Sequence, residues 1–586
     1  MCTRRSWNFR ESARGGKGLV TLDGRLWRRY FRLAVPYWRL DSKWPARGLL
    51  LLLVVLMLGN TGFSVLLNEQ VGETTSALAS RERDRFWTSI YKSAGYLCIS
   101  VPLFACYYYV RDRLGNQWRR WMTSQFLNRY LSNRSYYRLV SDESIDNPDQ
   151  RISEDINTFT QKSLYYLLLF SGATIQLAMF SGVLWSISKV LMVSLVVYGF
   201  VGTFIAVFVF GRRLTGLNFM QLRREADFRS QLIRIRENAE SIAFYRGEEQ
   251  EQAHAKRGFL AAFANYLKVI RWQFFLNFYQ YGLTSLTTII PSVVLVPQVF
   301  SGTLEVGRVV EAVGAFTMVF SAFTVIVENF ESLSRFVAGV DRLSTFRRAL
   351  DTQAAAAKAG EAIEAEEGSH LSLEDVTVQI PAQERALVKK LSVEVEPGNG
   401  LVIVGPSGSG KSSLLRAIAG LWTSGKGKII RPGAEDMLFL PQSPYMVEGT
   451  LRRQLLYPAL EEGVPDEDLE KVLKAVNLPD LIERSGGLDV ELKWSKVLSI
   501  GEQQRLAIAR VLLTKPQYVI LDEATSALDL ENEEKMYRKL HSNSMTLVSV
   551  CHRPSILKYH EQVLELSGKG KWKVYPSKEY TFSEGA

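Results

Sequence analysis

A glycine-rich segment in the last third of the chain has the composition of a phosphate-binding loop. It reads Gly405-Pro406-Ser407-Gly408-Ser409-Gly410-Lys411-Ser412-Ser413, which contains the complete P-loop pattern G-x-x-x-x-G-K-S. Glycines let backbone N–H groups surround phosphates, and the N-terminus of a following helix favours an anion. The pattern predicts that these nine residues bind ATP, with Lys411 at the β- and γ-phosphates and Ser412 on Mg²⁺.

Two further segments carry groups that suit phosphate chemistry. Asp522 and Glu523 end an apolar run over residues 518–521, which predicts a buried strand with carboxylates at its C-terminal edge. Asp522 is a candidate ligand of Mg²⁺, and Glu523 is a candidate for polarising the attacking water. The segment Ser499-Ile500-Gly501 opens a predicted helix, so Ser499 and Gly501 are candidates for a second phosphate-binding helix end.

The residues around the glycine-rich segment predict the elements that position it. Residues 400–404 predict a strand before it and residues 413–418 predict a helix after it. This is the context that a P-loop requires, and it argues against a chance glycine-rich turn. We therefore predict an α/β P-loop NTPase domain over residues 369–586.

Six long apolar blocks precede this domain, at residues 47–67, 93–110, 164–187, 190–210, 274–297 and 309–329. A helix needs about 20 apolar residues to cross a bilayer, so the set favours six transmembrane helices over buried core helices. Only Ser188-Lys189 separates the third block from the fourth, which predicts a tight hairpin. Glu311 and Glu328 lie near the ends of the sixth block, where we expect interfacial exposure, although intramembrane carboxylates are functional candidates by default.

The net charge is +11, and basic segments beside membrane helices account for it without a nucleic-acid partner. The loops at 111–162 and 211–271 are long and basic, which predicts helical arms on the cytoplasmic side together with both termini. The segments at 68–90, 188–189 and 298–308 then face outward. Residues 26–38 alternate arginines with aromatic residues and predict a helix in the lipid interface, which Pro36 would break or turn.

The composition divides the chain into four parts. We predict a cytoplasmic N-terminus with the interfacial elbow helix over residues 1–45, a transmembrane domain over 46–349, an Ala- and Glu-rich linker over 350–368, and the nucleotide-binding domain over 369–586. The cysteines, Cys2, Cys98, Cys106 and Cys551, are too few and too scattered for a disulfide framework or a zinc site.

The soluble motifs together resemble the ATP-binding cassette (ABC) domain. Gln442 in 440–444 matches the Q-loop, residues 526–529 match the D-loop, and His552 matches the switch histidine. The resemblance implies ATP and Mg²⁺ as cofactors, catalytic roles for Glu523, His552 and Gln442, and metal coordination by Gln442. It also implies that the signature of one cassette, with Ser499 and Gly501, covers the ATP of another. A chain with one cassette would then be a half-transporter that pairs with a second identical subunit.

The membrane half narrows this resemblance. Residues 147–156, 225–229 and 237–248 resemble the peroxisomal fatty-acyl half-transporters and their bacterial relatives. Residues 36–38 and the signature lean toward the bacterial BacA/SbmA-related branch with a fused ATPase. The resemblance implies a type IV exporter-like fold and a solute such as cobalamin, a peptide or an acyl lipid, with import and export both open.

Two residues depart from the family pattern. Ile380, before Pro381, stands where the family places an aromatic residue under adenine, and Ile500 replaces the commoner Gly of the signature.

The leading hypothesis is an ATP-driven transporter in a bacterial inner membrane. An organellar membrane stays open, because the arginine-rich start with Arg4, Arg5, Arg10 and Arg14 mildly resembles a transit peptide. The alternative function is an ATP-gated pore or a regulatory membrane protein. Such proteins often lack the catalytic glutamate, whereas Glu523 is present. The six spans exclude a soluble ABC ATPase.

Overall fold

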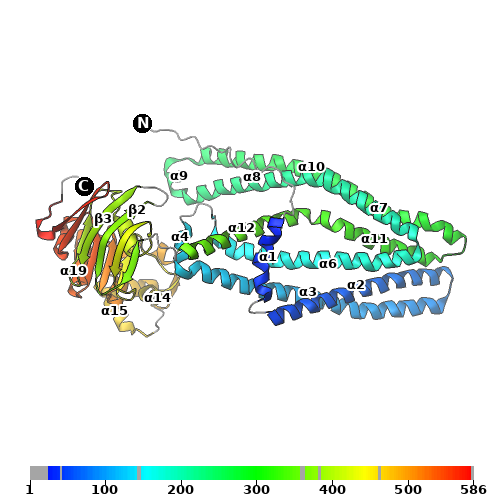
Figure 1. The fold of residues 1–586 in the computed structure, drawn as a ribbon, viewed down its shortest axis with the longest axis horizontal. Helices are drawn as coiled ribbons and strands as arrows, with labels where there is room; N and C mark the ends of the chain where they lie inside the picture. The colour runs from blue at the N-terminus through cyan, green and yellow to red at the C-terminus, as the bar shows by residue number, and fades with distance from the viewer. Residues whose placement is uncertain are drawn as a thin grey trace. The chain divides into compact units, whose positions relative to one another are not determined.

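The computed structural model describes residues 24–39, 43–140, 145, 147–356, 363–380, 385–458 and 463–582. The predictions for the N-terminal arginines and Pro381 lie outside these residues. The chain forms two compact units, Met1–Asp351 and Thr352–Ala586, one built of long helices and one that contains the sheets (Figure 1).

The first unit is helical. Its helices are α1 (Gly24–Arg39), α2 (Lys43–Ala79), α3 (Arg83–Leu131), α4 (Ser135–Val140), α5 (Pro148–Gln150), α6 (Ile156–Ile187), α7 (Lys189–Ile205), α8 (Arg212–Glu237), α9 (Ala239–Tyr245), α10 (Glu248–Phe300), α11 (Val306–Glu328) and α12 (Phe330–Ala356). Short irregular helices η2 (Ser132–Arg134), η3 (Arg151–Asp155) and η4 (Ala206–Gly211) join some of them. In Figure 1 the long helices α8 and α10 run side by side.

Six helical segments are long and apolar enough to cross a membrane. They are Trp44–Ala79, Arg83–Val140, Pro148–Ile187, Lys189–Glu237, Glu248–Phe300 and Val306–Val325. Each contains or overlaps one predicted block, so the prediction of six spans is confirmed. The first five segments run well beyond their apolar blocks. Helices α8 and α10 supply the helical arms expected over residues 211–271. The break between α6 and α7 is the single residue Ser188, whose hydroxyl accepts from Leu191 N at 3.3 Å.

Helices α2 and α11 are in direct backbone contact along a glycine seam formed by Gly72, Gly307 and Gly314. A Cβ added to Gly307 would lie 2.0 Å from the carbonyl oxygen of Gly72, and one added to Gly314 would lie 1.9 Å from Asn68 Oδ1. The backbone N–H of Gly307 donates to Ser76 Oγ at 3.1 Å. Only glycine leaves room for this approach, so the seam fixes α2 against α11.

The two glutamates of α11 have different surroundings. The seam covers Glu311, which is 6% exposed and pairs with Arg308 at 2.9 Å. Its backbone carbonyl also accepts from Asn68 Nδ2 at 2.9 Å. The prediction of interfacial exposure is therefore wrong for Glu311, because α2 packs over this turn of α11. Glu328 at the other end of the helix is exposed.

Helix α1 continues through Pro36 to Arg39, so the predicted break at Pro36 is wrong. A proline inside a helix leaves the carbonyl four residues earlier without its usual donor. Here Arg347 NH1 donates to that carbonyl, Arg32 O, at 2.7 Å. The inner face of α1 is buried, and the ring of Tyr37 stacks on Trp118 with centroids 5.5 Å apart.

The second unit contains three sheets. The largest has the order β12 (Lys571–Pro576), β11 (Gln562–Gly568), β4 (Leu401–Val404), β10 (Thr546–Val550), β9 (Tyr518–Asp522) and β6 (Met437–Leu440). Its strands are parallel except β12. A second sheet has the order β1 (Glu364–Glu367), β5 (Gly425–Arg431), β2 (Leu371–Gln379) and β3 (Ala386–Val395), and β7 (Gly449–Thr450) pairs with β8 (Glu491–Leu492). The helices are α13 (Lys411–Ile418), α14 (Leu451–Leu456), α15 (Asp466–Ala475), α16 (Leu481–Ser485), α17 (Trp494–Val497), α18 (Ile500–Thr514) and α19 (Leu530–Ser542).

The sheets begin earlier than the sequence predicted. Residues 364–367, assigned to the linker, form β1, which pairs in parallel with β5 from Glu364 opposite Lys428. Ile363 is buried in the core beside this strand. An acidic edge strand next to a basic one is a long-range pairing, which the Ala- and Glu-rich composition of the segment could not indicate.

Candidate ATP site

Four loops of the second unit leave the same edge of the large sheet. Strands β4, β6, β9 and β10 are parallel, and they are followed by Gly405, Gln442, Glu523 and His552. Because the carboxyl ends of parallel strands meet at one edge, the topology gathers these residues, and this edge is where open α/β sheets bind ligands.

The glycine-rich loop connects β4 to α13 with backbone angles that favour glycine. Gly405 has φ +143°, Gly408 +78° and Gly410 +105°. A Cβ added to Gly405 would lie 2.3 Å from the carbonyl oxygen of Leu566. The loop therefore needs glycine at this position for both conformation and space.

Lys411 and Ser409 bring a buried ammonium and a buried hydroxyl to this loop. Lys411 Nζ donates to Gly405 O at 2.6 Å and to Pro406 O at 3.2 Å. Burial lowers the pKa of the Lys411 ammonium, and the negative charges of Glu523 and Asp522 oppose that shift. The hydroxyl of Ser409 is buried and finds no hydrogen-bond partner among the described residues. A buried ammonium and an orphaned hydroxyl in a glycine loop fit a phosphate ligand.

Asp522 and Ser412 supply two oxygens at the end of β9. Ser412 Oγ donates to Asp522 Oδ1 at 3.1 Å. Burial raises the pKa of the Asp522 carboxyl, the hydrogen bond from Ser412 opposes that shift, and the nearby Glu523 carboxylate adds to it. Hydroxyl and carboxylate oxygens suit Mg²⁺, so this pair fits the predicted metal.

Glu523 lies between the other two predicted catalytic residues. Gln442 Nε2 donates to Glu523 Oε2 at 3.0 Å, and His552 Nε2 lies 3.4 Å from Glu523 Oε1. Glu523 has φ +50°, and its N–H donates to Val550 O at 3.2 Å. A non-glycine residue held in the left-handed region costs about 1–3 kcal/mol and is typical of functional sites.

Ser499 and Gly501 have other neighbours within the chain. Ser499 caps α18 and forms a capping box with Glu502, and Gly501 lies against the backbone of Ala527. Arg484 pairs with Glu502 at 2.5 Å. Burial alone would raise the pKa of Glu502, but the hydrogen bonds from Arg484 and Ser499 outweigh it and hold the pKa below its usual value. The signature helix is thus pre-organised, while its predicted contact with ATP stays a prediction.

The structure adds residues that sequence reasoning did not single out. Gln504 is 1% exposed, and its side chain donates to Gln442 O and accepts from Ala527 N, both at 3.1 Å. It thereby joins the Q-loop to the D-loop. Buried Glu533 accepts from Thr525 at 2.7 Å and from Arg553 at 2.9 Å. The available signals were positional, since Gln504 lies within the signature segment 498–505 and Arg553 follows His552.

The residue expected to cover adenine is half-buried. Ile380 donates its N–H to Arg385 O at 3.1 Å. An aromatic side chain lies against the preceding residue, because Trp422 Nε1 donates to Gln379 O at 2.8 Å. The departure from the family pattern at Ile380 therefore occurs beside an indole ring.

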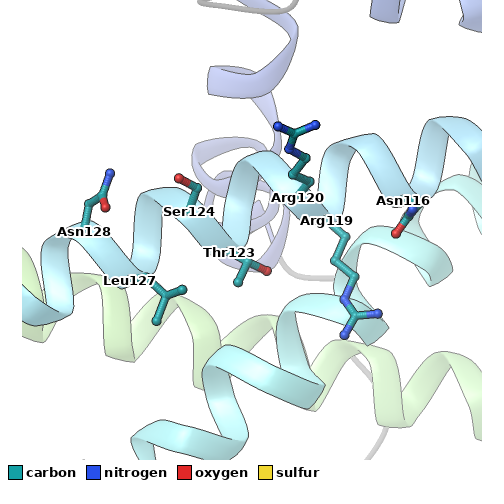
Figure 2. A pocket seen from close by; sticks show the side chains of 7 residues that line it. All are labelled: Asn116, Arg119, Arg120, Thr123, Ser124, Leu127 and Asn128. Atoms are coloured by element: carbon teal, nitrogen blue, oxygen red, sulfur yellow. The ribbon is translucent and has the colours of Figure 1, made fainter. Parts of the chain in front are cut away.

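A depression of about 390 Å³ lies in the first unit, along the exposed face of α3. Figure 2 shows that all its lining side chains project from this one helix, and that Arg119 and Arg120 point away from each other. The two cations do not converge on one anion, and the depression contains no carboxylate. The depression therefore lacks the convergent polar groups that the candidate ATP site has.

Two family models match the chain. Residues 34–300 match the ABC transporter transmembrane region 2, and residues 388–526 match the ABC transporter model. A solved bacterial Atm1-family ABC exporter with ATP bound has a TM-score of 0.69 at 19% identity, covering 91% of this chain and 96% of that one. That likeness supports the exporter-like fold.

Three curated relatives cover most of the chain. An uncharacterized ABC transporter ATP-binding protein of Synechocystis is 42% identical over 92% of this chain and 83% of its own length. The chloroplastic ABC transporter D family member 2 of Arabidopsis thaliana is 38% identical over 92% and 86%. The lysosomal cobalamin transporter ABCD4 of Homo sapiens is 31% identical over 91% and 94%. With a membrane region and one ATPase domain fused in a single polypeptide, this multi-pass membrane protein belongs to the ATP-hydrolysing ABC half-transporters whose relatives include the D family.

Proposed function

We propose that the chain works as a homodimer that uses ATP to move a bulky amphipathic or hydrophilic solute across a membrane. Cobalamin, a peptide and an acyl lipid are the candidate solutes. One observation carries the proposal. Glu523 is held in a left-handed backbone between Gln442 and His552, so the hydrolytic carboxylate that a non-transporting pore or regulator often lacks is present and supported.

The chain's own groups divide the work of hydrolysis. Lys411 and the backbone N–H groups of residues 405–413, other than Pro406, hold the β- and γ-phosphates. Ser412, Asp522 and Gln442 would hold Mg²⁺, which supplies positive charge against the phosphates when bound. Glu523 polarises the water whose oxygen attacks the γ-phosphorus as the bond to the ADP oxygen breaks, and His552 orients that site.

The paired subunit completes each site in this proposal. Ser499 and Gly501 at the start of α18 would cover ATP bound to the partner's glycine-rich loop. Arg484 holds Glu502 back through the ion pair at 2.5 Å, which keeps that carboxylate away from the incoming phosphate. Helices α8 and α10 then act as levers between the cassettes and the spans.

The orientation follows from charge and the compartment from relatives. Basic loops support a cytoplasmic side for both termini and the ATPase domain. The arginine-rich α1 would contact the surrounding membrane lipids. A bacterial inner membrane is proposed, and an organellar membrane is the alternative. Relatives named for the chloroplast and the lysosome support that alternative.

The experiment compares the wild type with Glu523→Gln in proteoliposomes. We expect the variant to bind ATP yet lose at least about 100-fold in turnover, because the water is no longer polarised. Uptake of labelled cobalamin, peptide or acyl lipid should fall with it. The control is Glu531→Gln, which removes a surface carboxylate paired with Lys535. Near-normal hydrolysis by Glu523→Gln would remove Glu523 from this role, and ATP turnover without movement of any solute would favour the pore or regulator.

A further inference from the structure

A small cavity lies between α7, η4, α10 and α11 in the helical unit. Its volume is about 30 Å³, and its lining includes Thr203, Tyr279, Gln280, Thr284, Phe320 and Glu328. The lining residues come from four elements that pack together, unlike the one-sided depression on α3. The cavity is therefore a site at which several elements converge.

Glu328 supplies the only carboxylate of this lining. One of its oxygens, Oε1, accepts from Thr324 Oγ1 at 3.0 Å. Within the described ranges, no cation forms an ion pair with Glu328. The other glutamate of the same helix, Glu311, is neutralised by Arg308 at 2.9 Å. Glu328 is exposed, three residues beyond the end of the span Val306–Val325. A carboxylate in this position without a cation can serve as a counter-ion, and such groups mark solute or ion pathways.

The remaining lining suits a positive group. The Tyr279 hydroxyl donates to Gly202 O at 3.1 Å, so that hydroxyl is engaged. The aromatic residues Tyr279 and Phe320 both line the cavity. Aromatic faces attract ammonium groups. Thr203, Thr284 and Gln280 add oxygens that can accept N–H bonds.

The backbone beside the cavity is irregular. The π-helical segment η4 begins at Ala206, which lines the cavity. Such π-bulges are frequent at functional sites. This observation is independent of Glu328.

The volume limits what enters. A water molecule occupies about 30 Å³ of liquid, so the cavity admits one ammonium head and leaves the body of the molecule outside. A phosphate or carboxylate head would meet the charge of Glu328 without compensation.

We propose that the cavity binds the primary ammonium head of the transported solute, with Glu328 as its counter-ion. The inference rests on the proposed transport function and names the substrate class within it: amphipathic or peptidic molecules that carry a free amino group.

The test uses the full-length protein in nanodiscs of phosphatidylcholine, a lipid without a primary amine. The probes are monodansyl diaminododecane, which has one free amine, and the same molecule acetylated at that amine. Fluorescence titration should show the wild type binding the amine at least about tenfold more tightly than the acetylated probe, because only the amine gains the ion pair. Glu328→Gln should bind both equally.

Glu69→Gln is the matched control, because Glu69 is also an exposed carboxylate on a spanning helix. It should keep the wild-type preference. Thr284→Val gives a second variant that retains every charge and should reduce the preference. Basal ATP turnover of each variant verifies that it is folded.

Each outcome decides the proposal. Equal binding of both probes by the wild type, or a preference retained by Glu328→Gln, would overturn it. If added phosphatidylethanolamine abolishes binding of the amine probe, the cavity binds the ammonium head of a lipid. That result would overturn the assignment to the transported solute. A Glu328-dependent preference without vectorial transport would keep the site and reject the proposed transport function.

Discussion

At the scale of single residues, Ile380 is the residue that we expect to cover adenine. An aliphatic side chain covers a base but lacks the stacking face of Tyr, which is worth about 1–3 kcal/mol per base in nucleic-acid sites. Ile380→Tyr should therefore tighten ATP binding by about fivefold or more in calorimetric titration and improve discrimination against GTP. Ile380→Leu serves as the control. An unchanged affinity would assign stacking to another ring, and Trp422, bonded to Gln379 at 2.8 Å, is the ring to test next.

A second residue-scale prediction concerns the buried His560. Its Nδ1–H donates to Ile556 O at 3.0 Å, and Nε2 accepts from Ser549 Oγ at 2.8 Å. This network uses the neutral ring. Burial lowers the pKa of His560 to about 4, the bond to Ile556 opposes the shift, and the neighbouring His541 adds to it.

The sign of the pH effect follows. Between pH about 6.5 and about 4 the unfolded chain binds the proton and the folded chain does not, so stability falls as pH falls through this window. Across the whole window the free energy of unfolding falls by about 3 kcal/mol. The thermal unfolding temperature of the ATPase unit, measured within the full chain, should fall as the pH is lowered through this window. The fall should be smaller in His560→Gln than in the wild type. Parallel curves for the two proteins would contradict the assignment.

At the scale of elements, α18 links two loops of the ATP site through Gln504. Gln504→Met keeps the volume but removes the bonds to Gln442 O and Ala527 N, both at 3.1 Å. We expect kcat for ATP to fall about tenfold with little change in KM, since the loops shift while the phosphate loop is intact. Unpaired buried groups should also cost about 1–3 kcal/mol of stability. The exposed Gln517→Met is the control, and a variant that changes KM alone would assign Gln504 to binding instead.

Elements also show which predictions the sequence could support. The P-loop and the strand before Asp522 are local patterns, so residue order alone located them. Burial of Glu311 depends on α2, more than 200 positions away in the chain. The uninterrupted helix at Pro36 depends on Arg347, and β1 depends on β5. These features result from tertiary partners that local propensity does not encode.

At the scale of the whole molecule, the shared-site arrangement predicts complementation between lesions. Lys411→Ala breaks the phosphate loop, and Ser499→Arg breaks the signature, so each homodimer has two damaged sites. A mixed dimer combines both lesions at one interface and leaves the other interface intact. Differently tagged subunits, co-expressed and purified as mixed dimers, should recover part of the ATPase activity. Activity no higher than that of either homodimer would count against sharing.

The glycine seam constrains how such a dimer can move. Where Gly307 meets Gly72, no side chain lies between the two backbones to change rotamer and absorb a displacement. Helices α2 and α11 should therefore move as one rigid body. Opening of the transmembrane domain must then occur between other helix pairs. Spin labels at the exposed Leu78 and Met318 would then keep one separation throughout the ATP cycle. The two labelled helices would form a fixed reference against which movements of α8 and α10 can be measured.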